Sequence, residues 1–223
     1  MTSVEHSNHY TGEKGHAYFA YQNEGGMQRG CINARKFSPY VRATDVVLDF
    51  GCANGSLLLN LECRRRIGVE VNPTARSVAT AAGVEAYESV AEVADGSIDV
   101  IVSNHVLEHV LCPLQALRDL RRTLKAGGRL VVCLPIDDWR TQRELDVDNP
   151  DHHLYTWTPL LMGNLLAEAG YRVDRVWVYT HAWPPSRWRQ LDRRLPVWLF
   201  DLICAFTAWR FKRRQIMALG GVP

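Results

Sequence analysis

The 223-residue chain has little excess charge, no closely paired cysteines and no hydrophobic run long enough to cross a membrane. Lys and Arg number 26 against 24 Asp and Glu, and a net charge of +2 gives no argument for a nucleic-acid partner. Six cysteines without a C-x-x-C pair disfavour a disulfide framework or a cysteine zinc site and favour reduced thiols in the cytoplasm. The polar N-terminal residues lack the pattern of a secretory signal. The composition fits one soluble domain of ordinary size.

The most informative motif is an apolar run that breaks into a glycine-rich turn. Val46-Val47-Leu48-Asp49-Phe50 is followed by Gly51-Cys52-Ala53-Asn54-Gly55-Ser56, and a second apolar run then ends in Glu70. A strand, a tight turn, a helix and a second strand ending in a carboxylate build a nucleoside pocket in parallel sheets. The glycines let the backbone approach a ligand, and Glu70 can accept hydrogen bonds from both ribose hydroxyls. The sequence predicts a nucleoside cofactor at this edge.

The glycine spacing distinguishes two classes of nucleoside cofactor. The dinucleotide fingerprint is G-x-G-x-x-G, but here Ala53 replaces its second glycine and Ser56 its third. The run instead resembles the motif of class I S-adenosylmethionine-dependent methyltransferases. In that motif a carboxylate precedes three alternating small residues, matched here by Asp49, Gly51, Ala53 and Gly55.

The resemblance extends over residues 45–180. Residues 95–110 resemble the fourth strand and its following loop, and residues 113–132 resemble the next helix and the turn into the fifth strand. The resemblance implies a Rossmann-like α/β fold with a seven-stranded, mostly parallel sheet, helices on both faces and an antiparallel last strand. It also implies S-adenosyl-L-methionine as cofactor and S-adenosyl-L-homocysteine as product. No metal is expected, because a methyl group on a sulfonium is already activated for transfer.

Alternating apolar runs and helical patterns predict the same architecture. We expect strands at residues 46–50, 66–70, 84–87, 98–103, 129–134, 171–180 and 214–219, and helices at 55–64, 73–82, 113–124 and 158–169. Thr158, Pro159 and Gly170 mark the ends of the last helix as its N-cap, its first residue and its C-terminal stop. Residues 1–40 are expected to form a helical lid segment, and residues 41–223 the cofactor-binding domain with an amphipathic insertion at about 184–212.

The resemblance places cofactor contacts at the strand ends. Asp49 would order the glycine turn and the amino group of the cofactor, Asn104 and His105 would lie near the methionine moiety, and Ser89 would flank the adenine. The expected cofactor residues are Tyr18, Asp49, Gly51, Cys52, Ala53, Gly55, Glu70, Val71, Asn72, Ser89, Asn104 and His105.

The N-terminal stretch with Tyr10, Tyr18, Tyr21 and Gln22 resembles the lid segments of small-molecule methyltransferases. The alternative is a loosely packed arm.

Four residues on the loops after strands are candidates for catalysis: His109, Asp137, His152 and His153. An oxygen nucleophile usually needs a base to take its proton, whereas a neutral amine needs mainly orientation. The alternatives are that His109 only shapes the pocket, that Asp137 and its neighbour Asp138 are solvated loop carboxylates, and that the His152-His153 pair lies in an ordinary polar loop.

Residues 195–209 form a Trp-rich apolar stretch between arginine-rich flanks, within the segment 195–211 that is expected to make the outward contact. An apolar segment of about 15 residues suits a helix lying in a membrane interface, where tryptophans and basic residues meet the headgroups. Packing on the domain or on a second copy in a homodimer is the alternative. Both stay open, so the protein is expected in the cytoplasm, with contact at the inner face of the membrane as one option.

The predicted function is methylation of a small-molecule or glycan acceptor. The start Tyr18-Phe19-Ala20-Tyr21-Gln22, the His-rich loop and the insertion resemble methyltransferases of bacterial surface-glycan and glycolipid assembly, which implies a sugar hydroxyl, free or lipid-linked. The alternatives are a lipophilic acceptor such as a quinone, or a non-catalytic S-adenosylmethionine-binding partner protein. No nucleic-acid partner is expected, because Ser103-Asn104-His105-Val106 stands where an Asn-Pro-Pro-aromatic motif would be.

Overall fold

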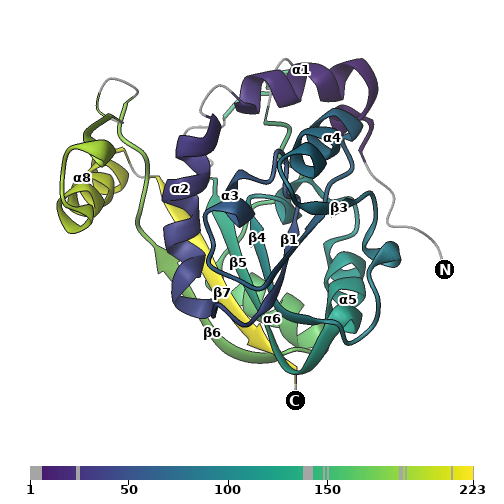
Figure 1. Cartoon of the computed structure of the whole chain (residues 1–223). Coiled ribbons are helices and arrows are strands. Elements are labelled where there is room, and N and C mark those ends of the chain that lie inside the picture. Colours follow the sequence, from purple (N-terminus) through teal and green to yellow (C-terminus); the bar gives the residue numbers. More distant parts are fainter. Residues whose placement is uncertain are drawn as a thin grey trace.

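The computed structural model describes residues 7–23, 26–137, 143–147, 149, 151–185, 188, 190–211 and 213–222. A seven-stranded sheet forms its centre, in the order β3-β2-β1-β4-β5-β7-β6 (Figure 1). The strands are β1 (Val46–Phe50), β2 (Arg65–Val69), β3 (Glu85–Tyr87), β4 (Ile98–Asn104), β5 (Leu124–Ile136), β6 (Arg172–Tyr179) and β7 (Arg214–Gly221).

The strand order determines where a ligand can bind. β1 pairs in parallel with both β2 and β4, and the chain winds outward from β1 in opposite directions. In such sheets a crevice opens outside the carboxyl ends of the strands at the point of reversal. β7 runs antiparallel to β5 and β6, between which it is inserted. The predicted fold class, including its antiparallel last strand, is confirmed.

Alternating side chains divide the core into two layers. On β5, Leu130, Val132 and Leu134 face a cluster that includes α5 (Pro113–Thr123) and α6 (Pro159–Glu168). Val131 and Cys133 face the other layer, which includes α2 (Gly26–Phe37), α3 (Ser56–Leu59) and α4 (Pro73–Ala81). Because both faces of the sheet are covered, the strands read as nearly continuous apolar runs.

The predicted helix over residues 55–64 is too long, because α3 ends at Leu59. Arg66 of β2 donates from Nε to the Leu58 carbonyl at 2.9 Å and from Nη2 to the Leu61 carbonyl at 3.0 Å. The Asn60 amide donates back to the Leu57 and Leu58 carbonyls, and Arg66 supplies a further donor where the helix ends. The predicted cap of α6 is confirmed, since the Thr158 hydroxyl accepts from the Leu161 amide at 3.2 Å.

The N-terminal segment consists of η1 (Asn8–Tyr10), α1 (Gly12–Asn23), α2 and η2 (Ser38–Tyr40). Figure 1 shows α1 lying across the end of the sheet at which the parallel strands finish. In α2, by contrast, Ala34 and Phe37 are buried in the core of the domain. A movable lid therefore remains a prediction for α1 alone, while α2 is packed into the fold.

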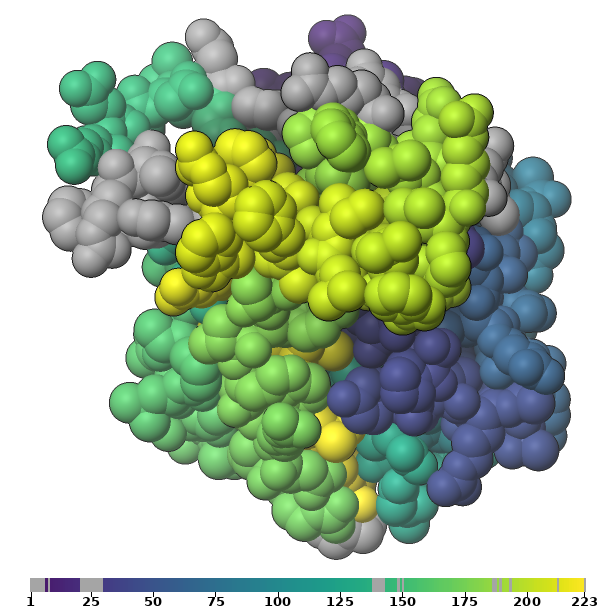
Figure 2. All heavy atoms as spheres, turned by 90° about the vertical axis from the view of Figure 1, so that its left-hand side faces the viewer, coloured from purple at the N-terminus to yellow at the C-terminus, as the bar shows by residue number. Residues whose placement is uncertain are grey.

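The expected insertion contains η5 (Gln190–Arg193) and α8 (Val197–Arg210). Phe200 and Cys204 of α8 pack against Ile32 of α2, and Arg35 of α2 donates to Asp192 of η5 at 2.6 Å. Figure 2 shows α8 beside α2 on one face of the molecule. Within the described part of the chain, no helix has the length and apolar character needed to cross a bilayer.

Candidate functional site

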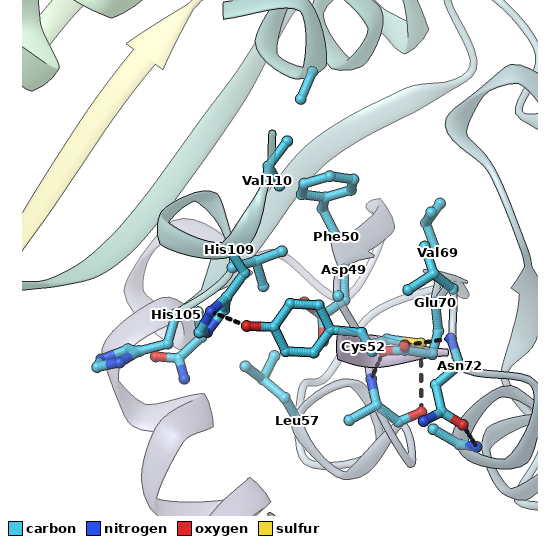
Figure 3. Close-up of a pocket in the computed structure, with 18 of the residues that line it drawn as sticks. Asp49, Phe50, Cys52, Leu57, Val69, Glu70, Asn72, His105, His109 and Val110 are labelled. Carbon is cyan, nitrogen blue, oxygen red and sulfur yellow. Dashed lines mark hydrogen bonds between the residues drawn. The ribbon is translucent and has the colours of Figure 1, made fainter. Parts of the chain in front are cut away.

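A cavity of about 970 Å³ lies at the carboxyl ends of the central strands. Its walls come from the turn after β1, the end of β2, the loops after β4 and β5, and the N-terminal segment (Figure 3). Tyr10 of η1 and Tyr18 of α1 also line it, and their rings meet edge to face with centroids 5.0 Å apart. The predicted aromatic stretch therefore covers the site, although the side chains of Tyr21 and Gln22 lie outside the described part.

The turn after β1 brings bare backbone to the cavity wall. Gly51 has φ +80°, and its amide donates to the Val69 carbonyl at 2.8 Å. A Cβ on Gly51 would lie 2.3 Å from Cγ2 of Val106, so no larger residue fits there without movement. Gly55 has φ +77° and is the N-cap of α3. The two predicted glycine positions are thus required by the local conformation.

Glu70 ties this turn to the end of β2. Its Oε2 accepts from the Ala53 amide at 2.9 Å, and its Oε1 accepts from the Asn72 amide at 2.8 Å (Figure 3). Each carboxylate oxygen keeps a second lone pair for a ligand. Burial raises the pKa of Glu70, and the two backbone hydrogen bonds act against this rise. The carboxylate is therefore held in one orientation at the cavity wall.

Asp49 lies beneath the same turn with 2% of its surface exposed. Burial, with the nearby charge of Glu70, raises the pKa of Asp49 to about 8. Two neighbouring carboxyl groups in a buried wall favour a cationic ligand, because a positive charge stabilises both in their ionised form. The sulfonium and the amino group of S-adenosylmethionine are charges of this kind.

Other predicted cofactor residues have structural partners of their own. The Asn72 side chain accepts from the amides of Thr74 at 3.0 Å and Ala75 at 3.2 Å and donates to the Gly15 carbonyl at 2.8 Å. It therefore caps α4 and holds α1, and its amide is committed to these partners. Ser89 accepts from the Ala91 amide at 3.2 Å at the start of η3 (Val90–Glu92). Cys52, Val71, Asn72 and Ser89 all line the cavity.

A buried lysine that the sequence did not indicate joins three elements beside the cavity. Lys36 of α2 is 6% exposed, and its Nζ donates to Asn104 Oδ1 and to Gln215 Oε1, each at 3.1 Å. His105, next to Asn104, has φ +59°, and burial together with the Lys36 charge holds its pKa well below the ordinary value. Asn104 and His105 thus lie at the cavity wall.

Two histidines meet at the cavity wall. The ring centroids of His109 and His153 are 5.0 Å apart. His109 Nδ1 lies 2.6 Å from the Tyr10 hydroxyl, and His153 Nδ1 lies 2.8 Å from Asp137 Oδ2. Burial and the neighbouring His153 lower the pKa of His109 to about 4. Burial lowers the pKa of His153, but the hydrogen bond and charge of Asp137 outweigh it and raise that pKa.

Of the four predicted catalytic residues, the fold therefore brings His109, Asp137 and His153 together at the cavity. His152 has φ +45° and stacks on His9, with ring centroids 4.6 Å apart. The described residues that line the cavity do not include His152. Asp138 lies outside the described residues.

Residues 6–176 match the model of the family described as Methyltransferase domain. A probable methyltransferase of Aspergillus luteorubrus is 29% identical over 135 residues, which are 49% of this chain and 47% of that protein. An uncharacterized methyltransferase of Schizosaccharomyces pombe is 28% identical over 102 residues, 40% of this chain and 39% of that protein. The chain spans less than half the length of the curated relatives it matches.

Solved structures share the fold at low sequence identity. A possible histamine N-methyltransferase from Thermotoga maritima has a TM-score of 0.63 and 16% identity, with 93% of this chain and 99% of that chain covered. A phosphoethanolamine N-methyltransferase of Haemonchus contortus, solved with S-adenosylhomocysteine, has a TM-score of 0.60 and 14% identity, with 89% of this chain and 53% of that chain covered. The chain belongs to the methyltransferase-domain family, whose cofactor is S-adenosylmethionine.

Proposed function

We propose that the protein transfers the methyl group of S-adenosylmethionine to a hydroxyl group of a sugar, free or lipid-linked. The observation that carries the proposal is one cavity with two different walls. The glycine turn, Asp49 and Glu70 form one wall, and the pair of His109 and His153 faces it from another. A hydroxyl nucleophile must lose a proton during methyl transfer, and imidazoles in reach of the acceptor suit that requirement.

On this proposal, different residues contact different parts of the cofactor. Glu70 accepts from the ribose hydroxyls, and Asp49 faces the positively charged end through the glycine turn. Asn104 and His105 flank the methionine moiety, while Val71 and Ser89 flank the adenine. Tyr18, Gly51, Cys52 and Ala53 supply contact surface, Gly55 acts through the start of α3, and Asn72 acts through α4 and α1. These assignments follow the family resemblance, and the lining of one cavity by all of these residues except Gly55 supports them.

The insertion supports an acceptor with a lipid portion. Trp183 and Arg214, which precede and follow α8 along the chain, both line the cavity. The outer face of α8 carries Trp198 and Trp209 at 65% and 69% exposure, and Arg210 is exposed beside them. We infer that this face lies on an anionic membrane surface, where apolar side chains are buried and basic side chains are attracted to the headgroups. A second copy of the chain on the same face would instead give a homodimer.

A methyl-transfer assay tests the proposal directly. Purified protein with methyl-labelled S-adenosylmethionine is given sugar nucleotides, lipid-linked sugars, a quinol and simple amines. The expected product is a sugar methyl ether. Transfer to the quinol alone would replace the sugar with a lipophilic acceptor. Cofactor binding without transfer to any acceptor would favour a non-catalytic cofactor-binding protein.

A further inference from the structure

Three side chains beside the cavity form a cluster of metal-binding type. Glu108, His109 and His153 each offer one ligand atom, and these atoms all lie within 4.8 Å of one another. Glu108 is fully buried, and among the described residues neither of its carboxylate oxygens has a hydrogen-bond partner. A buried carboxylate without donors is costly unless a proton or a cation satisfies it. His105 Nδ1 lies 3.6 Å from Glu108 Oε1, beyond hydrogen-bond distance, and the imidazoles of His109 and His153 beside the carboxylate favour a cation over a proton.

The hydrogen bonds around the two imidazoles prepare them as ligands. Tyr10 can donate its hydroxyl proton to the Asp151 carbonyl at 3.2 Å, and it then accepts from His109 Nδ1 at 2.6 Å. In this arrangement Nε2 of His109 carries a free lone pair, and it lies 3.9 Å from Glu108 Oε1. His153 donates from Nδ1 to Asp137 Oδ2 at 2.8 Å, which likewise leaves its Nε2 free.

Metal-bound histidines characteristically donate their second ring nitrogen to a carboxylate, a carbonyl or another oxygen, which fixes the tautomer and the ring orientation. Asp137 does this for His153, and Tyr10 does it for His109. Both partners are therefore in place around the cluster.

We propose that Glu108, His109 and His153 bind a divalent transition-metal ion. Two imidazoles and one carboxylate suit Zn²⁺ or Fe²⁺, whereas Ca²⁺ and Mg²⁺ prefer a shell made of oxygens. Three protein ligands leave coordination positions open, and His109 and His153 line the cavity. With the ion bound, the free nitrogens of both imidazoles are occupied, so the ion takes over their part in the proposed function: it ligates neighbouring hydroxyls of an acceptor, lowers the pKa of the attacking hydroxyl so that its proton passes to water, and holds it toward the methyl group. This last role rests on the proposed function, while the binding of the ion does not.

Metal binding is measured on tag-free protein, because an affinity tag would itself bind metal. The protein is stripped with a chelator and titrated calorimetrically with Zn²⁺ and, in parallel, with Co²⁺ while the visible spectrum is recorded. We expect one ion per chain and a cobalt spectrum without a thiolate charge-transfer band. No binding, or a thiolate band, would overturn the site, the latter by assigning the ion to cysteines.

Matched variants locate the ion. Glu108→Gln and His153→Asn should each weaken binding at least tenfold, since losing a ligand should cost no less than the roughly 10- to 100-fold seen for its supporting partners. His152→Asn is the control, because this neighbouring histidine stacks on His9 and asparagine tolerates its φ of +45°. S-adenosylhomocysteine binding and circular dichroism verify folding. Equal metal affinity in all three variants would refute the assignment.

The experiments test the metal site and the proposed function independently of each other. Metal binding without transfer to any acceptor would refute the function and keep the site. Sugar methylation by chelator-stripped protein at an unchanged rate would keep the function and refute the acceptor-holding role of the ion.

Discussion

The carboxylate of Glu70 accepts a hydrogen bond from the backbone amide of Ala53 at 2.9 Å, so the end of β2 fixes the turn that follows β1. Removal of this side chain should therefore weaken cofactor binding in two ways, by loss of the proposed hydrogen-bond acceptor of the ribose and by loosening of the turn. For Glu70→Ala we expect S-adenosylhomocysteine affinity to fall by about 1.5–3 kcal/mol, the usual value of a hydrogen bond to a charged group. Calorimetric titration measures the change.

Glu62→Ala is the matched control for Glu70→Ala. Glu62 is an exposed carboxylate in the loop before β2, and the described lining of the cavity does not include it. The control should bind as the parent does. An unchanged affinity in Glu70→Ala would show that Glu70 does not hold the ribose.

Cofactor affinity should depend on pH through Asp49. The pKa of this buried carboxyl is raised to about 8 without ligand. A cationic ligand favours the ionised form and lowers that pKa, so binding near neutral pH releases a proton. We therefore expect affinity to rise with pH up to about 8, by as much as roughly tenfold per pH unit.

Titrations in two buffers with different ionisation enthalpies count the protons released on binding. Asp49→Asn should lose both the proton release and the pH dependence while it still folds. The test range runs from pH 6, about two units below the raised pKa of Asp49, to pH 8, close to that pKa. If the parent released no proton in this range, Asp49 would not face the positive end of the cofactor.

Gly51→Ala should damage the site more than its backbone angle alone would predict. Both Gly51 (φ +80°) and Gly83 (φ +93°) have left-handed backbone, but a Cβ at Gly51 meets Val106 at 2.3 Å while one at Gly83 meets no described atom within 4 Å. Gly83→Ala should cost about 1–2 kcal/mol of unfolding free energy from strain. Gly51→Ala should cost more and also abolish cofactor binding.

Denaturant unfolding and S-adenosylhomocysteine titration of both variants make this comparison. Equal stability losses with cofactor binding retained in Gly51→Ala would mean that Val106 moves aside and that the turn is not tight.

Local pattern was enough to predict most of the fold. The apolar runs of β1 and β4 alternate between two buried faces, and short-range signals such as Thr158 and Gly170 mark the ends of α6. The length of α3 was missed because Arg66, a residue of the next strand, donates to the Leu58 carbonyl at the helix end. Such a contact leaves no mark in the helix's own sequence.

The site residues at strand ends could be predicted from the sequence. Those that depend on contacts between residues far apart in the chain could not. Lys36 reaches Asn104 across 68 positions of the chain, and in sequence it looks like an ordinary helix-surface lysine. His152 and His153 are indistinguishable by pattern, but the positive φ of His152 turns it toward His9 while His153 meets Asp137. The cluster of Glu108, His109 and His153 depends on the fold bringing His153 to the loop after β4, which no local pattern indicates.

The outer face of α8 presents large apolar side chains to solvent. Phe200 is fully buried against α2, so it does not belong to this face, whereas Trp198, Leu202, Phe206 and Trp209 are between 58% and 69% exposed. Their spacing of three or four residues places them on one side of the helix. Replacing Trp198, Phe206 and Trp209 with serine should abolish sedimentation with vesicles of anionic lipid, because it removes the large apolar groups that enter the interface.

Leu160→Ser with Leu161→Ser is the control for this experiment, since these residues of α6 are also exposed, at 72% and 52%, but lie away from the arginines that flank α8. The control should still sediment, and added salt should weaken binding of the parent because the arginine contribution is screened. A parent that ignores vesicles but elutes as a dimer, and becomes monomeric in the α8 variant, would assign the face to a second copy of the chain. The lipid portion of the proposed acceptor would then lose its support, and free sugars would become the acceptors to assay.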